Sequence, residues 1–105
     1  MSAPSSEGGP YQVHNSKAIA QAFLELQHQA TQEGRGAEVL QAAREIYERL
    51  RHDPNEFGEP LYHLPNLQMH VRTGLIRPLN VDFGVCEDRP LVFIKAVRLL
   101  SLARN

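Results

Sequence analysis

"HDPNEFGEPLYHLPNLQMHVR", residues 52–72, separates two halves of the chain that differ in apolar periodicity. Before this stretch, apolar residues recur every three or four positions, which is the period of an α-helix. After it, they alternate with polar residues or form short blocks, as in β-strands. Pro54 cannot continue a helix, and Gly58 and Pro60 predict a turn from which the chain leaves extended. The stretch therefore predicts a helical first half and a β-sheet second half.

The first half is expected to contain a short strand and two helices. Tyr11 and Val13 alternate with polar neighbours and predict the strand. Asn15 or Ser16 can cap the first helix, which ends at the glycines of "EGRG". The second helix is expected at about residues 37–51. The apolar face of the first helix consists of Ile19, Phe23, Leu26 and Ala30, and that of the second consists of Val39, Ala43, Ile46 and Leu50. The tight connection between them predicts an antiparallel helix hairpin.

The second half predicts three strands, at about residues 67–73, 79–86 and 91–98. A strand, a helix hairpin and a three-stranded antiparallel meander make an α+β fold, with the helices packed on one face of the sheet. We expect residues 11–105 to form one domain after a disordered leader at residues 1–10, which has almost nothing to bury. The side chains expected to be largely buried are Phe23, Leu26, Val39, Ile46, Leu50, Val81, Phe83 and Val85, with Phe93 or Ile94 beside them.

Composition narrows the class of protein. Eleven basic and twelve acidic residues give a net charge of -1, so no overall basic field indicates nucleic acid binding. Cys86 is the single cysteine, which excludes an internal disulfide and fits a reducing compartment. No apolar run reaches the roughly 18 residues of a membrane span, and the first ten residues do not resemble a signal peptide. The expected location is therefore the cytoplasm.

No cofactor or metal is expected from the sequence. A glycine-rich phosphate loop is absent, because "EGRG" follows a predicted helix and not a strand. His14, His28, His52 and His63 are scattered along the chain. No histidine, cysteine or carboxylate pair stands at a recurring ligand spacing, which argues against a metal site.

Three segments in this order resemble the RelE/ParE superfamily of bacterial toxins: "YQVHNSKAIAQAFLEL", "LRHDPNEFGEPLYHL" and "VDFGVCEDRPLVFIKAV". The resemblance covers about residues 10–100. It implies a RelE/ParE-like fold and a toxin of a type II toxin–antitoxin system, held by an antitoxin protein. The RelE-type branch implies a ribosome-dependent mRNA endonuclease. A ParE-like toxin that binds a protein such as gyrase, or an inactive protein-binding module of the same fold, are the alternatives.

The RelE-type branch implies a basic catalytic set, because attack of a ribose 2′-hydroxyl on phosphorus builds negative charge. His70 and Arg72 match two basic positions of the first meander strand, and His70 could act as a general base. The other candidates are Arg77, which is nearest to the expected arginine of the next strand, Lys95, and Arg98 near the end of the last strand. Asp82, expected on the same face, and the missing late tyrosine favour the two binding alternatives.

The same residues also have plainer interpretations. Arg72 and Arg77 could pair with Glu59, Asp82 or Glu87 across the sheet, and Lys95 could protect a strand edge. An apolar patch for the antitoxin is expected around Tyr47, Leu61, Tyr62 and the tail leucines Leu99, Leu100 and Leu102. Alternatively, the tail could join two copies of the chain as a homodimer.

Overall fold

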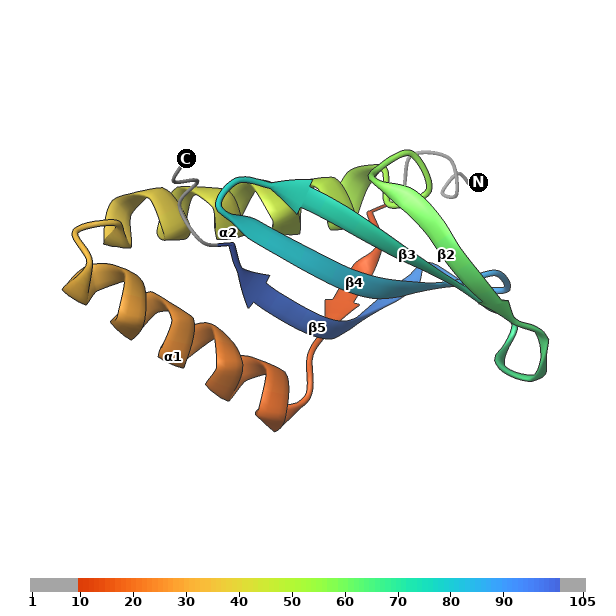
Figure 1. The fold of residues 1–105 in the computed structure, drawn as a ribbon. Coiled ribbons are helices and arrows are strands. Elements are labelled where there is room, and N and C mark those ends of the chain that lie inside the picture. The colour runs from red at the N-terminus through yellow and green to blue at the C-terminus, as the bar shows by residue number, and fades with distance from the viewer. Residues whose placement is uncertain (1–9, 101–105) are drawn as a thin grey trace.

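Five strands and two α-helices form the main elements of residues 10–100, the part of the chain that the computed structural model describes (Figure 1). In chain order they are β1 (Gln12–His14), α1 (Lys17–Gln32), α2 (Gly36–His52), β2 (Glu59–Leu64), the 3-10 turn η2 (Pro65–Leu67), β3 (Met69–Ile76), β4 (Leu79–Cys86) and β5 (Leu91–Leu99). The leader expected at residues 1–10 falls, except for Pro10, outside the described residues. None of the helices among residues 10–100 has the length and apolarity needed to cross a membrane.

The strands form one mixed sheet in the order β1-β5-β4-β3-β2. Strands β2 to β5 make an antiparallel meander, and β1 joins the edge by pairing in parallel with β5. Helix α1 contacts β5, and α2 contacts β1, β3 and β4. The two helices run in opposite directions, as Figure 1 shows, so the α+β fold and the helix hairpin are confirmed.

The predicted three-stranded meander is wrong in its strand count, because residues 59–64 form the additional strand β2. Pro60 had indicated a turn, since proline cannot donate a backbone hydrogen bond. An edge strand such as β2 tolerates proline because one side of it has no neighbouring strand. The following strand starts at Met69 and not at residue 67, because Leu67 lies in η2 and Gln68 has a left-handed backbone with φ 48°.

One hydrophobic core fills the space between the helices and the sheet. Most of the predicted core residues are buried there: Val39, Ile46, Leu50, Val81, Phe83, Val85 and Ile94. Phe23 and Leu26 are only partly buried, so the prediction was wrong at these two positions, whereas of the pair Phe93 or Ile94 it is Ile94 that is buried. Phe23 lies on α1, whose only buried residue is Ala30, and its ring packs against Tyr47 with centroids 6.1 Å apart. Because α1 lies along β5, much of its apolar stripe is at the margin of the core.

The register of the strands defines two faces of the sheet. Directly paired residues of antiparallel strands point to the same side. His70 pairs with Val85 and Arg72 with Phe83, so both basic side chains lie on the helix-covered face. Thr73 pairs with Asp82, and Asn80 with Arg98, on the opposite face, which we call the open face.

The expectation that Asp82 shares a face with His70 and Arg72 is therefore wrong. Alternation within each strand was predicted correctly, but the apolar side of β3 faces the open side of the sheet. Met69 is buried there over Gly84, where an added Cβ would lie 3.0 Å from Met69 Cγ. Both sides of β3 thus carry packed residues, and its polarity pattern alone does not show which side meets the helices.

Candidate functional site

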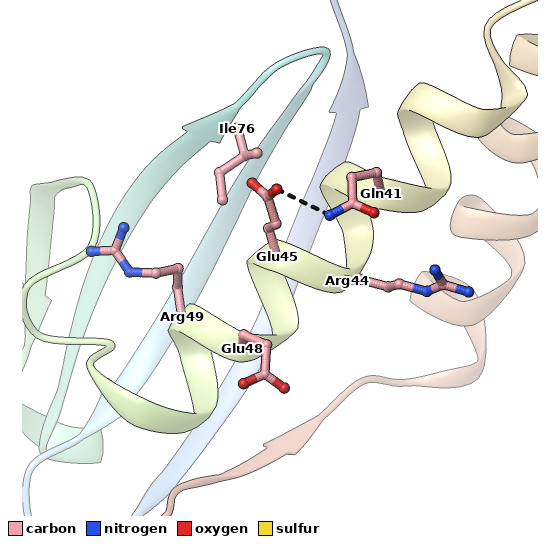
Figure 2. Close-up of a pocket in the computed structure, with 6 residues that line it drawn as sticks. All are labelled: Gln41, Arg44, Glu45, Glu48, Arg49 and Ile76. Atoms are coloured by element: carbon pink, nitrogen blue, oxygen red, sulfur yellow. Dashed lines mark hydrogen bonds between the residues drawn. The ribbon is translucent and has the colours of Figure 1, made fainter.

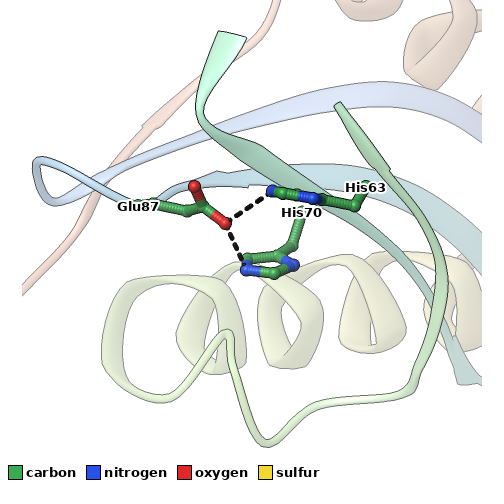
Figure 3. A group of neighbouring side chains, drawn as sticks. All are labelled: His63, His70 and Glu87. Atoms are coloured by element: carbon green, nitrogen blue, oxygen red, sulfur yellow. Dashed lines mark ion pairs between the residues drawn. The ribbon is translucent and has the colours of Figure 1, made fainter. Parts of the chain in front are cut away.

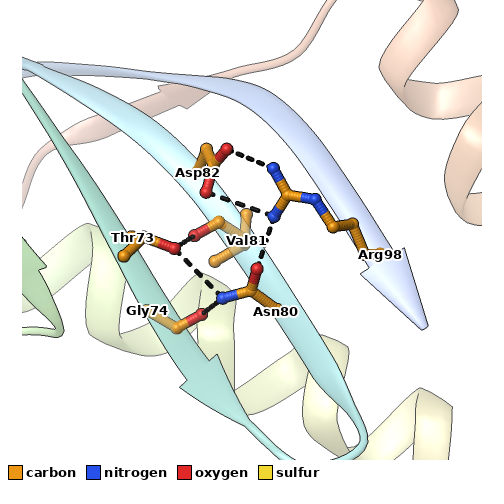
Figure 4. Close-up of polar contacts among 6 residues, drawn as sticks. All are labelled: Thr73, Gly74, Asn80, Val81, Asp82 and Arg98. Atoms are coloured by element: carbon orange, nitrogen blue, oxygen red, sulfur yellow. Dashed lines mark hydrogen bonds and ion pairs between the residues drawn. The ribbon is translucent and has the colours of Figure 1, made fainter. Parts of the chain in front are cut away.

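A polar cluster on the open face, formed by Thr73, Asn80, Asp82 and Arg98, joins three strands (Figure 4). The Arg98 guanidinium donates from Nη1 and Nη2 to the two carboxylate oxygens of Asp82, and from Nη1 to the side-chain oxygen of Asn80. Asn80 Nδ2 in turn donates to Thr73 Oγ1 at 3.0 Å and to the Gly74 carbonyl oxygen at 2.9 Å. The cluster therefore links β5 to β4 and β4 to β3.

The charge of Arg98 is matched within this cluster. Hydrogen bonds from Arg98 lower the pKa of Asp82 below its usual range, against a smaller opposing effect of burial. The same hydrogen bonds raise the pKa of Arg98. The Asp82 side chain is 18% exposed and that of Arg98 is 49% exposed. A bidentate pair of this kind leaves the guanidinium with reduced capacity to bind a phosphate.

The ion pair predicts a dependence of stability on pH. Because the pKa of Asp82 is lower in the folded state, its charge stabilises the fold above the unfolded carboxyl pKa of about 3.9. This stabilisation is lost as the pH falls through the lower folded pKa. Asp82→Asn should therefore destabilise the protein at pH 7, by less than about 1 kcal/mol because Arg98 is half exposed. The difference from wild type should vanish in acid.

Urea unfolding at pH 7 and at successively lower pH measures this effect. Asp88→Asn, which removes a carboxylate from the turn between β4 and β5, controls for the loss of one negative charge. A destabilisation by Asp82→Asn that persists unchanged into acid would show that the ion pair is not its cause.

Arg72 and His70, two further residues of the predicted catalytic set, lie on the helix-covered face, and each has its own hydrogen-bond partners there. Arg72 donates from Nε to the Phe57 carbonyl and from Nη2 to the Gly58 carbonyl, both at 3.0 Å. It thereby fixes the segment after α2 to β3 and makes none of the carboxylate pairs that the sequence suggested. His70 lies at the far end of the sheet, beside His63 and Glu87 (Figure 3).

Arg77 and Lys95 complete the predicted set, and both are exposed. Arg77 lies in the turn between β3 and β4. Lys95 is the extra residue of a bulge in β5, because Asp82 pairs with Ala96 and the next residue, Phe83, with Ile94. Within residues 10–100, neither basic group has a carboxylate within 4.0 Å. The structure does not gather the five predicted residues around one point.

Grooves also run along α2 and beside the end of β3, and the second of these is bordered by Thr73 and Asn80 of the cluster. One, of about 370 Å³, runs along α2 and is lined by Gln41, Arg44, Glu45, Glu48, Arg49 and Ile76 (Figure 2). Its two arginines and two glutamates balance in formal charge, so it has no evident preference for an anion or a cation. The other, of about 630 Å³, borders Gly58, Gly74 and Leu75, where β3 continues beyond its pairing with β2.

Sequence reasoning missed one group of side chains, formed by His63, His70 and Glu87. His63 and His70 are directly paired across β2 and β3, and Glu87 follows the last residue of β4. Recognising residues 59–64 as a strand would have placed His63 opposite His70. This group could therefore have been found from the pairing of the two strands, but not from the spacing of its residues along the chain.

Comparison with protein-family models, curated proteins and solved structures gave no match.

Proposed function

We propose that this chain is the toxin-like component of a type II toxin–antitoxin system, has a RelE/ParE-like fold, and acts by binding a protein rather than by cleaving RNA. The chain order supports this: a strand, a helix hairpin and an antiparallel meander, with the first strand placed beside the last. The observation that carries the binding mode is the pairing of Arg98 with Asp82, on the face opposite Arg72 and His70.

The electrostatics of the basic residues oppose RNA cleavage. A nuclease of this type must surround one phosphate with positive groups that stabilise charge in the transition state. Here Arg98 bonds to a carboxylate, and Arg72 bonds to two backbone carbonyls on the other face. Arg77 and Lys95 remain exposed, but one lies in a turn and the other in a bulge. A ParE-like toxin, or an inactive binding module, requires no such set.

The β2 edge of the sheet offers a binding surface. Leu61 and Tyr62 on β2 are 48% and 51% exposed, and Leu67 in η2 and Leu75 on β3 are also exposed. Within the described residues, β2 has a neighbouring strand only on its β3 side. Such an edge with apolar side chains suits an extended segment of a partner, which adds as a strand and fills side-chain pockets. We assign this surface to the antitoxin.

The predicted apolar patch is thus present only in part. Leu61 and Tyr62 are exposed as expected, whereas Tyr47 and Leu99 are partly buried and pack against the core. Leu100 is half-buried, and its carbonyl accepts a hydrogen bond from Arg35 Nη2 at 3.2 Å. Leu102 lies outside the described residues, so a homodimer through the tail remains a prediction.

Induced expression in a bacterial host, with and without the neighbouring reading frame, tests the proposed function. We expect growth to stop while messenger RNA stays intact, and co-expression of the neighbouring product to restore growth. Normal growth together with capture of that product would instead indicate the inactive binding module. Fragmented messenger RNA that becomes intact with Arg98→Ala would contradict the proposal.

The binding surface can be tested in the same cells. Tyr62→Ser on β2 should weaken rescue by the neighbouring product, because it removes an exposed apolar contact without touching the core. Leu24→Ser is the control, since Leu24 is another exposed apolar residue, at 66% against 51% for Tyr62, but lies on α1. Equal rescue of both variants would place the antitoxin elsewhere.

A further inference from the structure

We infer that His63, His70 and Glu87 form a binding site for a divalent transition metal, with Zn²⁺ as the best fit. The three side chains come from β2, from β3 and from the residue after β4, and Figure 3 shows them turned toward one another. One ligand atom from each lies within 4.8 Å of the others. The site is separate from the Arg98 cluster and does not depend on the proposed function.

The donor atoms suit zinc in kind and in spacing. Zinc in proteins takes imidazole nitrogen and carboxylate oxygen, and two histidines with one glutamate are a known set for a site that keeps a fourth position open. The two Nε2 atoms lie 2.8 Å (His63) and 2.5 Å (His70) from the same oxygen, Glu87 Oε2. Bond lengths of about 2.0–2.2 Å in a tetrahedral site place ligand atoms about 3.3 Å apart. Each nitrogen would therefore have to separate from Glu87 Oε2 by less than about 1 Å to admit the ion, which side-chain rotation can supply.

The backbone holds the three residues in this arrangement. His63 and His70 are opposite each other in the β2–β3 ladder, and their rings stack with centroids 4.6 Å apart. The Glu87 amide donates to the Gln68 carbonyl at 2.8 Å. This hydrogen bond continues the β3–β4 ladder one residue beyond the Met69–Cys86 pair. Ligands on paired strands lose little freedom when a metal binds, so the site is largely preorganised.

The charges around the cluster also favour a cation. Within residues 10–100, the ion pairs of Glu87 involve only these two histidines, so no arginine or lysine neutralises the carboxylate. All three side chains are accessible to solvent, which lets the metal enter and leaves its fourth position to water or to a group from a partner. A bound ion would join β2 to β3 and to the end of β4, next to the surface assigned to the antitoxin.

Titration of the chelator-treated, full-length chain with Zn²⁺ alone in a calorimeter tests this inference. We expect one ion per chain and a melting temperature that rises with Zn²⁺ concentration, because the metal binds the folded state. Co²⁺ in place of Zn²⁺ should show the visible absorption of a four-coordinate ion. His63→Ala, His70→Ala and Glu87→Gln should each weaken binding by at least about tenfold.

His52→Ala is the matched control, because His52 also lies near a carboxylate, Glu48, at 3.3 Å, but has no second histidine. Its affinity should equal that of the wild type. Circular dichroism of each variant separates loss of the site from loss of the fold. The inference is overturned if Zn²⁺ does not bind to the folded wild type, or if His63→Ala and His70→Ala, shown to be folded, bind it as the wild type does.

Discussion

Phe83→Ala is expected to lower the free energy of unfolding by about 3–5 kcal/mol, which is the usual cost of removing a buried aromatic ring. Phe83 is fully buried at the centre of β4, the strand between β3 and β5. Its ring stacks on that of Phe57, with centroids 5.6 Å apart, and so connects the sheet to the segment after α2. A domain of this size has about 5–15 kcal/mol of stability in total, so the loss is severe.

Urea unfolding of the variant measures the loss, with Phe83→Leu as a milder change if the alanine variant does not fold. Phe23→Ala is the matched control, since Phe23 is only partly buried on α1 and should cost clearly less. Similar losses at the two positions would show that α1 is packed as deeply as the sheet, contrary to the structure.

The second large effect is expected at Gly58, where alanine should cost about 2–5 kcal/mol. Gly58 has φ +73°, and L side chains pay about 1–2 kcal/mol for this left-handed conformation. An added Cβ would also overlap the Thr73 carbonyl oxygen and lie 2.8 Å from Gly74 Cα, and overpacking adds about 1–3 kcal/mol. The backbone of β3 cannot rotate away as a flexible side chain could. We expect the segment before β2 to separate from β3.

Gly34 provides the matched control, because its φ is +77° but an added Cβ would meet nothing within 4 Å. Gly34→Ala should therefore show only the conformational cost of about 1–2 kcal/mol. Thermal unfolding and hydrogen exchange at the β2–β3 pairs compare the two variants. Equal losses, with β2 still protected in Gly58→Ala, would contradict the close approach of Gly58 to β3.

Local patterns were sufficient to predict most of the fold. The helix periods at Val39, Ile46 and Leu50 and the alternation at Val81, Phe83 and Val85 each face the core as predicted. Ser16 caps α1, with its Oγ accepting from the Ile19 amide at 3.2 Å. These features depend on residues only a few positions apart, so they can be predicted from a single sequence.

The candidate sites depended on register, which the sequence did not reveal. Arg98 was found at its predicted place near the end of β5, but its partner Asp82 was expected to share a face with Arg72. The register of β3 against β4 places Asp82 and Arg72 on opposite faces of the sheet. Similarly, His63 meets His70 only because Pro60 sits in an edge strand and not in a loop. Long-range pairing of this kind leaves no local pattern.

Incubation of the purified chain with ribosome-bound messenger RNA, with a RelE-type endoribonuclease as the positive control, distinguishes a protein-binding toxin from a nuclease. We predict that the messenger stays intact with the wild type and with Arg98→Gln alike, because Arg98 serves the ion pair with Asp82. Cleavage by the wild type that falls on the order of a hundredfold in Arg98→Gln would contradict the proposed binding function, because it would make Arg98 a group that stabilises the transition state.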